Sequence, residues 1–236
     1  MIPKVIHYCW FGKKKLPKEV RKCIKSWKKF CPEYKIVRWD ETNFDVTQNE
    51  FIKAAYDSKC WAFVSDYARL KIIYDNGGIY LDTDVELIKS LDDIINDEKV
   101  KCYMATQAEP HVINTGLGFG ATKEHQIISA MLNEYEDIVF DINKRNEFIC
   151  PKLNTNPFEK LGYRYSENIV MIDDIAIYPA EYFDPINSNG YNVTEKTISI
   201  HHYSASWENG THRLKRKIAY ILGPNIEGKI KALKGR

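Results

Sequence analysis

One segment of this sequence limits the possible folds more than any other, because it joins a helix, a sharp helix end, a buried strand and two acids. In chain order it consists of a helix-like stretch over residues 61–76, then Gly77, Gly78, the apolar run 79–81, Asp82, Thr83 and Asp84. The first glycine can adopt the left-handed conformation that ends a helix, and the second makes the turn into the strand. A buried strand with acids at its end is typical of an α/β fold, in which ligands bind at the strand ends of the sheet.

Predicted elements on both sides of this segment alternate between strand and helix. Strands are expected at residues 5–10, 34–39, 102–105, 116–120, 169–172 and 197–201. Helices are expected from Pro17 onward, around residues 51–56 and over residues 124–140. Residues 143–168 are rich in Asn, Pro and Lys and are expected to be irregular. This alternation predicts one α/β domain of the nucleotide-binding kind.

Length, charge and hydropathy exclude several classes of protein. A chain of 236 residues suits one domain with a small appendage, and a formal net charge of +2 argues against a dedicated nucleic-acid binder. No apolar run reaches the ~20 residues that a transmembrane helix needs, and the N-terminus has no cleavable signal pattern, so a cytoplasmic protein is expected. The six cysteines form no CxxC pair, which favours reduced core thiols over a zinc or redox site.

The C-terminal region differs from the rest of the chain in charge. Residues 211–236 are rich in Lys and Arg and contain one acid, Glu227, and the basic residues alternate with apolar ones. A basic amphipathic helix can lie on an anionic membrane surface, or it can be a solvated helix whose apolar side packs on the domain. We therefore expect a domain over residues 1–210 and a basic tail over 211–236, with peripheral contact at the inner membrane face as one interpretation of the tail.

The two aspartates predict a metal site. Side chains alternate along a strand, so Asp82 and Asp84 point the same way while Thr83 points the other way. Two carboxylates so close together repel each other unless a cation lies between or beside them. A divalent ion held by one or two carboxylates keeps coordination positions free for phosphate oxygens, which suits a nucleotide diphosphate leaving group. The expected ion is Mn²⁺ or Mg²⁺.

Another class of enzyme shares part of this pattern. Haloacid-dehalogenase-like phosphatases carry an apolar strand followed by Asp-x-Asp-x-Thr/Val, which residues 81–85 partly match, and Asp82 would then be the nucleophile. A later acidic pair is present at Asp173 and Asp174. In those enzymes, however, the nucleophile strand usually comes first in the chain, whereas here two strands and several helices precede it. The phosphatase stays the alternative, and a carbohydrate-binding module with a structural cation is a third interpretation.

Five short motifs occur in a fixed order along the chain. They are VIHYCWFG at 5–12, SDYAR at 65–69, GGIYLDTD at 77–84, NTG at 114–116 and HHYSASW at 201–207. Together they resemble the DXD-containing sugar transferases of glycosyltransferase family 32, which include α-mannosyl- and α1,4-galactosyltransferases and bacterial enzymes of capsular polysaccharide and lipooligosaccharide synthesis. The resemblance covers residues 2–207. It implies a GT-A-type, Rossmann-like nucleotide-sugar-binding domain with a mixed central sheet and a C-terminal basic helix.

The resemblance also implies roles for individual residues. Trp10 would stack on the nucleotide base through its flat indole. Asp66 and Arg69 share one face of a helix and would contact the donor sugar and the diphosphate. Asn114 would line the sugar or acceptor pocket. The other donor-binding residues would be Tyr8, Tyr80, Asp82, Ser206 and Trp207, of which the last two belong to a C-terminal loop.

At the metal site, the resemblance makes Asp84 the principal ligand, and Asp82 would reach the ion directly or through water. His202 would complete the site, because a neutral imidazole is a reasonable ligand for Mn²⁺. His201 would then point into the core, although the two neighbours could exchange roles. The expected catalytic residues are Asp82, Asp84, Arg69 and Asn114.

The expected function is that of a metal-dependent hexosyltransferase. It would move a sugar, with retention of configuration, from a UDP-sugar to a hydroxyl of a glycan or lipid-linked saccharide. Retention requires either a carboxylate nucleophile and two displacements, or front-face attack in which the departing phosphate takes the acceptor proton. No carboxylate nucleophile stands out in the sequence, which favours front-face attack. Acceptor choice is expected to depend on residues 150–162, where no motif matches.

Overall fold

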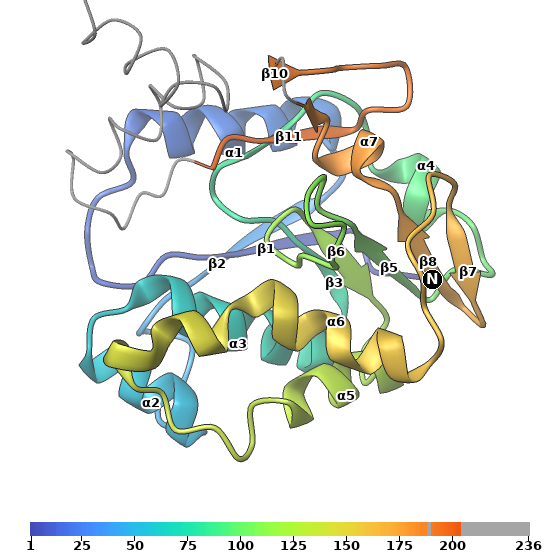
Figure 1. The fold of residues 1–236 in the computed structure, drawn as a ribbon. Coiled ribbons are helices and arrows are strands. Elements are labelled where there is room, and N and C mark those ends of the chain that lie inside the picture. The colour runs from blue at the N-terminus through green and yellow to red at the C-terminus, as the bar shows by residue number, and fades with distance from the viewer. Residues whose placement is uncertain (188–189, 204–236) are drawn as a thin grey trace, which may run out of the picture.

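A seven-stranded mixed sheet forms the centre of the protein in the computed structural model, which describes residues 1–187 and 190–203 (Figure 1). The strand order is β2-β1-β3-β6-β5-β8-β7. These strands are β1 (Val5–Cys9), β2 (Lys35–Trp39), β3 (Gly78–Tyr80), β5 (Cys102–Ala105), β6 (Phe119–Ala121), β7 (Val170–Ile172) and β8 (Ile175–Tyr178).

The sheet mixes parallel and antiparallel pairs. β1 runs parallel to β2 and β3, and β5 runs parallel to β8. β6 is antiparallel to both of its neighbours, and β7 is antiparallel to β8. The expected α/β architecture with a mixed central sheet is confirmed. β3 is a central strand and runs parallel to β1. The acids that follow β3 therefore lie beyond the carboxyl ends of these strands, where ligands bind in α/β sheets.

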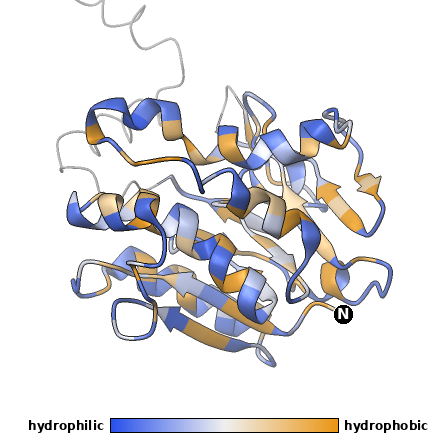
Figure 2. Ribbon diagram, turned by 90° about the horizontal axis from the view of Figure 1, so that it is seen from below, coloured by the Kyte–Doolittle hydropathy of each residue, from blue (hydrophilic) through white to orange (hydrophobic). Residues whose placement is uncertain are grey.

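Helices cover both faces of the sheet (Figure 1). One face carries α1 (Lys18–Phe30) with the short helices α4 (Asp92–Ile95) and α7 (Ala180–Phe183). The other face carries α2 (Glu50–Asp57), α3 (Trp61–Asn76), α5 (Gln126–Asn133) and α6 (Cys150–Lys160), with the 3₁₀ helix η1 (Ile142–Phe148) before α6. Each layer has its own hydrophobic core. The helices accordingly show hydrophilic and hydrophobic stretches in turn (Figure 2).

Two short ladders lie outside the main sheet. β4 (Val85–Leu87) pairs antiparallel with β11 (Ser199–His201), and β9 (Ile186–Asn187) pairs with β10 (Gly190–Tyr191). In the first ladder His201 lies opposite Val85. The strand near the C-terminal end of the described chain is therefore held beside the residues that follow the two aspartates.

The turn from α3 into β3 depends on two glycines and a buried histidine. Gly77 ends α3 with φ 65°, and Gly78 has φ 103°, with so little space that a Cβ there would lie 2.8 Å from Val5 O. His7 Nε2 lies 3.1 Å from Gly77 O, and Trp39 Nε1 donates to His7 Nδ1 at 2.9 Å. Burial lowers the pKa of His7 to about 4, so its imidazole is neutral and donates from Nε2 to Gly77 O.

Several predicted boundaries are wrong, chiefly between residues 116 and 168. Residues 143–168 are not irregular, because they include most of η1 and all of α6. Pro151 occupies the first turn of α6, where its missing N–H costs little, and Pro157 lies within the helix. The helix expected over 124–140 is shorter, and the strand expected at 116–120 begins at Phe119. β4 and β8 were not expected.

Some predictions fall on residues 204–236, which lie outside the described part of the chain. They concern Ser206, Trp207 and the basic tail, together with the boundary at residue 210. Among residues 1–187 and 190–203, the helices are all too short or too polar to span a membrane.

Candidate active site

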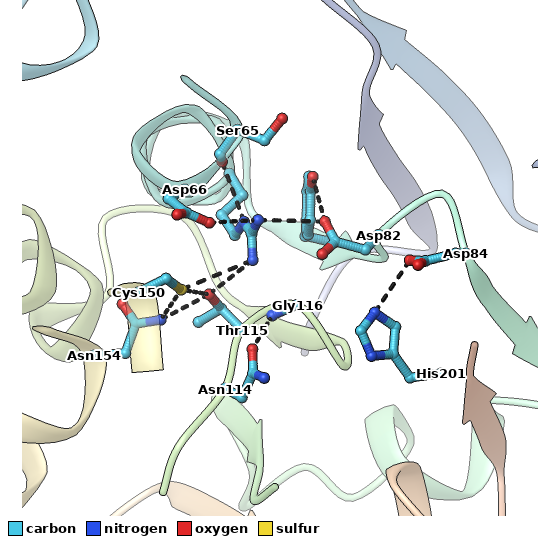
Figure 3. Close-up of polar contacts among 12 residues, drawn as sticks. Ser65, Asp66, Asp82, Asp84, Asn114, Thr115, Gly116, Cys150, Asn154 and His201 are labelled. Carbon is cyan, nitrogen blue, oxygen red and sulfur yellow. Dashed lines mark hydrogen bonds and ion pairs between the residues drawn. The ribbon is translucent and has the colours of Figure 1, made fainter. Parts of the chain in front are cut away.

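The two aspartates lie just beyond β3 at the edge of the sheet, as the strand pattern predicts (Figure 3). Tyr80, the last residue of β3, donates a hydrogen bond from its hydroxyl to Asp82 Oδ1 at 3.0 Å. Asp84 is buried, whereas the side chain of Asp82 is 22% exposed. One carboxylate is thus fixed from the strand and remains partly open to a ligand.

His201, rather than His202, faces this pair. His201 Nε2 lies 3.1 Å from Asp84 Oδ1, while His202 Nε2 lies 2.8 Å from Glu86 Oε2 on the outer side of the β4–β11 ladder. Neighbouring side chains on a strand point to opposite sides, so only one histidine can face inward. The expectation that His202 completes the metal site, with His201 in the core, is therefore corrected.

Asp82, Asp84 and His201 form a set that could hold a divalent ion. One ligand atom from each lies within 4.8 Å of the other two. Burial raises the pKa of Asp82; Arg69 lowers it, and the nearby Asp84 carboxylate raises it again. Burial alone would lower the pKa of His201, but Asp84 raises it above its usual value. Two carboxylates and an imidazole in a small, partly buried space fit a cation such as Mn²⁺, because the ion would offset the negative charge.

On the other side of Asp82, an ion pair on α3 extends the site. Arg69 Nη2 lies 2.7 Å from Asp66 Oδ1 and 3.4 Å from Asp82 Oδ1, and the guanidinium is 5.2 Å from the ring centroid of Tyr80. Burial raises the pKa of Asp66 to about 6, although Arg69 lowers it. The structure thus brings Asp66 and Arg69 of α3 together with Asp82, which lies beyond the next strand in the sequence.

A further group of residues lies behind Arg69, and the sequence analysis missed it. Arg69 Nη1 lies 3.4 Å from Thr115 Oγ1 and 3.9 Å from Cys150 Sγ (Figure 3). Asn154, one turn further along α6, contacts both of these atoms. The Cys150-x-x-x-Asn154 spacing places both on one helix face, but the prolines around them concealed the helix.

The metal-binding set and the Asp66–Arg69 pair line one cavity of about 880 Å³, a volume typical of a ligand pocket. Asp66, Arg69, Tyr80, Asp82 and Asp84 contribute to its wall together with His201. Aromatic side chains of the β1 loop and of the start of α3 form another part of the wall, namely Trp10, Phe11, Trp61 and Phe63. The cavity wall therefore combines charged and aromatic side chains.

Three further predicted residues have different positions relative to this cavity. Trp10 lines it and donates from Nε1 to Lys14 O at 2.7 Å. Asn114 also lines it, and its Oδ1 accepts from Gly116 N at 2.8 Å, which forms a turn. Tyr8 is 7% exposed and packs edge-on against Trp27 in the core, so it is not among the described lining residues. The roles of these residues stay predictions.

Comparison with known proteins shows which family the chain resembles. A family model described as "glycosyltransferase sugar-binding region containing DXD motif" matches residues 17–101. An uncharacterized glycosyltransferase, L373, of Acanthamoeba polyphaga mimivirus is 25% identical over 233 residues, 88% of this chain and 84% of that protein. Inositol phosphoceramide mannosyltransferase 3 of Schizosaccharomyces pombe is 32% identical over 99 residues, 40% of this chain and 28% of that protein.

Among solved structures, the PaToxG glycosyltransferase matches with a TM-score of 0.50 and 17% identity, over 67% of this chain and 69% of that chain. This likeness concerns the fold, and it confirms the expected GT-A-type architecture. The haloacid-dehalogenase alternative finds no support. The sequence matches and the aspartate pair at the edge of the cavity lead to one conclusion: the chain is a glycosyltransferase, and its residues 17–101 resemble the DXD-containing, family-32-like group.

Proposed function

We propose that this glycosyltransferase takes its sugar from a UDP-sugar, depends on Mn²⁺ or Mg²⁺, and transfers a hexosyl group to a hydroxyl of a glycan with retention. The observation that carries this proposal is the convergence of Asp82, Asp84 and His201 at one wall of a cavity that also contains the Asp66–Arg69 pair. A metal set beside a buried arginine suits a diphosphate, whose oxygens need both kinds of partner.

Asp84, His201 and Asp82 would hold the ion. When bound, it would stabilise the negative charge that develops on the leaving diphosphate. Tyr80 orients Asp82 by its hydrogen bond, so the carboxylate has one defined direction. This orientation is useful because positioned groups need no reorganisation during the reaction.

The remaining cavity residues would bind and orient the donor. Trp10 offers an aromatic surface for the base at one end of the cavity. Arg69 presents a rigid, planar guanidinium at the other end, and Asp66 beside it can accept hydrogen bonds from sugar hydroxyls. The donor would therefore lie along the cavity with its base near the β1 loop and its sugar near α3 and α6.

The state of the carboxylates supports front-face transfer. Among the described lining residues, the acids are Asp66, Asp82 and Asp84. Asp66 pairs with Arg69, Asp82 with Tyr80 and Arg69, and Asp84 with His201. Since each already has a partner, none is placed as a nucleophile for a two-step displacement. The departing phosphate oxygen would instead take the acceptor proton.

The acceptor belongs to the same proposal. We expect a glycan or a lipid-linked saccharide, as in synthesis of a capsular polysaccharide or a glycolipid, at the cytoplasmic side of the membrane. The name of the yeast relative includes a mannosyl group and a phosphoceramide, so a mannosyl donor is included in the test. The tail over 211–236 would hold the enzyme near such an acceptor, and deletion of residues 213–236 should abolish liposome binding.

A thermal-shift screen of UDP-, GDP- and CDP-sugars, each with and without Mn²⁺, tests the donor. A bound donor stabilises the folded state more the tighter it binds, so we expect the largest rise in Tm with one UDP-sugar and Mn²⁺ together. NMR of the product then tests retention through the anomeric configuration. A protein that none of these nucleotides stabilises would contradict the donor assignment.

A further inference from the structure

A buried polar cluster lies behind Arg69. It consists of Thr115, Cys150 and Asn154, which come from the loop before β6 and from the first turns of α6. Their exposed fractions are 0%, 6% and 0%. Buried polar side chains are costly unless they are well paired, so such a cluster beside an active-site cavity calls for an explanation.

Arg69 is held through all three of its nitrogens. Nε donates to Ser65 O at 3.1 Å, Nη2 contacts Asp66 and Asp82, and Nη1 contacts Thr115 and Cys150. The first two contacts come from α3 and from the DXD segment, and the third comes from the cluster. The third contact holds the remaining nitrogen, so all three corners of the planar guanidinium have a partner.

Thr115 in turn depends on Asn154. A threonine hydroxyl has one hydrogen and two acceptor positions. Arg69 Nη1 donates to Thr115 Oγ1 at 3.4 Å and Asn154 Nδ2 donates to it at 2.8 Å, which fills both acceptor positions. The hydroxyl hydrogen is then left for Cys150 Sγ at 3.3 Å. Asn154 therefore sets the direction of the hydroxyl that receives Arg69.

The two polar atoms of the Asn154 amide differ in their hydrogen bonding. Its Nδ2 also contacts Cys150 Sγ at 2.8 Å, so both amide hydrogens point into the cluster. Its Oδ1 is buried and has no hydrogen-bond partner among the described residues. An unpaired buried carbonyl lowers stability, so an apolar residue would suit folding better at this position. The contacts of Nδ2 with Thr115 and Cys150 explain why an amide occupies this position.

We propose that Asn154 is a positioning residue of this enzyme, which acts through Thr115 and Cys150 to hold the Arg69 guanidinium in the orientation that binds the donor. The inference builds on the proposed function, since it concerns the arginine that would meet the donor. It also gives α6 a role: its first turn lines the cavity with Cys150 and Pro151, and its second turn fixes the arginine from behind.

The test uses Asn154→Ala, which removes the amide, and Thr115→Val, which replaces the hydroxyl by a methyl group of similar size. Both should lower kcat/KM for the donor about 10- to 100-fold, because a small displacement of a positioning group is enough for such a loss. The affinity for UDP should fall as well, because UDP carries the diphosphate that Arg69 would contact. Thr115→Ser keeps the hydroxyl and should recover most of the activity. Asn156→Ala is the matched control on α6, because Asn156 bonds Glu134 away from the cavity.

Two further measurements separate positioning from a merely structural role. The double variant Asn154→Ala/Thr115→Val should be about as slow as the slower single variant, since both changes act through Arg69. A crystal structure of Asn154→Ala, like one of Thr115→Val, should show the guanidinium displaced from Asp82. Wild-type kcat/KM in either single variant, multiplying effects in the double variant, or an unmoved Arg69 would overturn the inference. If the wild-type protein bound no nucleotide-sugar, the proposed function would fail, and the crystal structure would still decide whether Asn154 positions Arg69.

Discussion

His7 makes the fold sensitive to acid in a way that can be calculated. Its imidazole is 4% exposed, accepts from Trp39 Nε1 and donates to Gly77 O, so the folded protein holds it neutral. Burial lowers its pKa from 6.5 to about 4. One pKa unit corresponds to about 1.4 kcal/mol. Protonation of His7 is therefore less favourable in the folded state than in the unfolded state by about 3 kcal/mol.

The sign of the effect follows from proton uptake. Above pH 6.5 both states are neutral at His7, and the residue adds no pH dependence. Between pH 6.5 and about 4 the unfolded chain takes up a proton that the folded chain does not, so acidification lowers the free energy of unfolding. Below about pH 4 both states carry the proton and no further loss follows.

The assay compares wild-type protein with His7→Gln by urea unfolding at several pH values from 7 to 4. Glutamine supplies a donor and an acceptor but does not titrate. The difference in the free energy of unfolding between wild type and variant should therefore shift by about 3 kcal/mol against the wild type over this range. Stability curves that stay parallel would refute the buried, neutral state of His7 and its hydrogen bonds to Gly77 and Trp39.

Four substitutions test the geometry of the site. His201→Ala should weaken Mn²⁺ binding at least about tenfold, whereas His202→Ala should leave it within about twofold, as measured by calorimetry; equal effects would contradict the corrected assignment. Gly116→Ala should fold but lose at least about tenfold in turnover, because the new Cβ would lie 2.8 Å from Asp82 Oδ2. Tyr80→Phe removes the hydrogen bond to Asp82 and should lower kcat/KM severalfold, in line with about 1 kcal/mol for one such bond; unchanged kinetics would show that this bond does not orient the carboxylate.

The sequence predicted the elements that carry strong local signals. The predicted helix over 61–76 matches α3, because Gly77 marks its end and the apolar pattern marks its length. The two aspartates follow β3 as predicted, because the apolar run before them is stable only when it is buried in the core. Asp66 and Arg69 share a helix face for the same local reason, and the structure brings them to Asp82.

What the sequence could not predict depended on long-range pairing or on atypical composition. The choice between His201 and His202 is set by the pairing of β11 with β4, two strands that are more than a hundred residues apart. β4 itself is only three residues long and has no clear pattern. α6 contains Pro151, Pro157 and several asparagines, which are typical of loops, and its polar cluster was missed with it.

The central claim is that Asp84 belongs to a metal-dependent nucleotide site, and calorimetry of UDP binding with and without Mn²⁺ tests it most directly. Wild-type protein should bind UDP clearly only when Mn²⁺ is present, because the ion links the diphosphate to the acidic set. Asp84→Asn should lose the dependence on Mn²⁺, while Thr83→Ala, in the turn between β3 and β4, removes no carboxylate and should retain it. UDP binding that is equal with and without Mn²⁺, or equal in wild type and Asp84→Asn, would contradict the account.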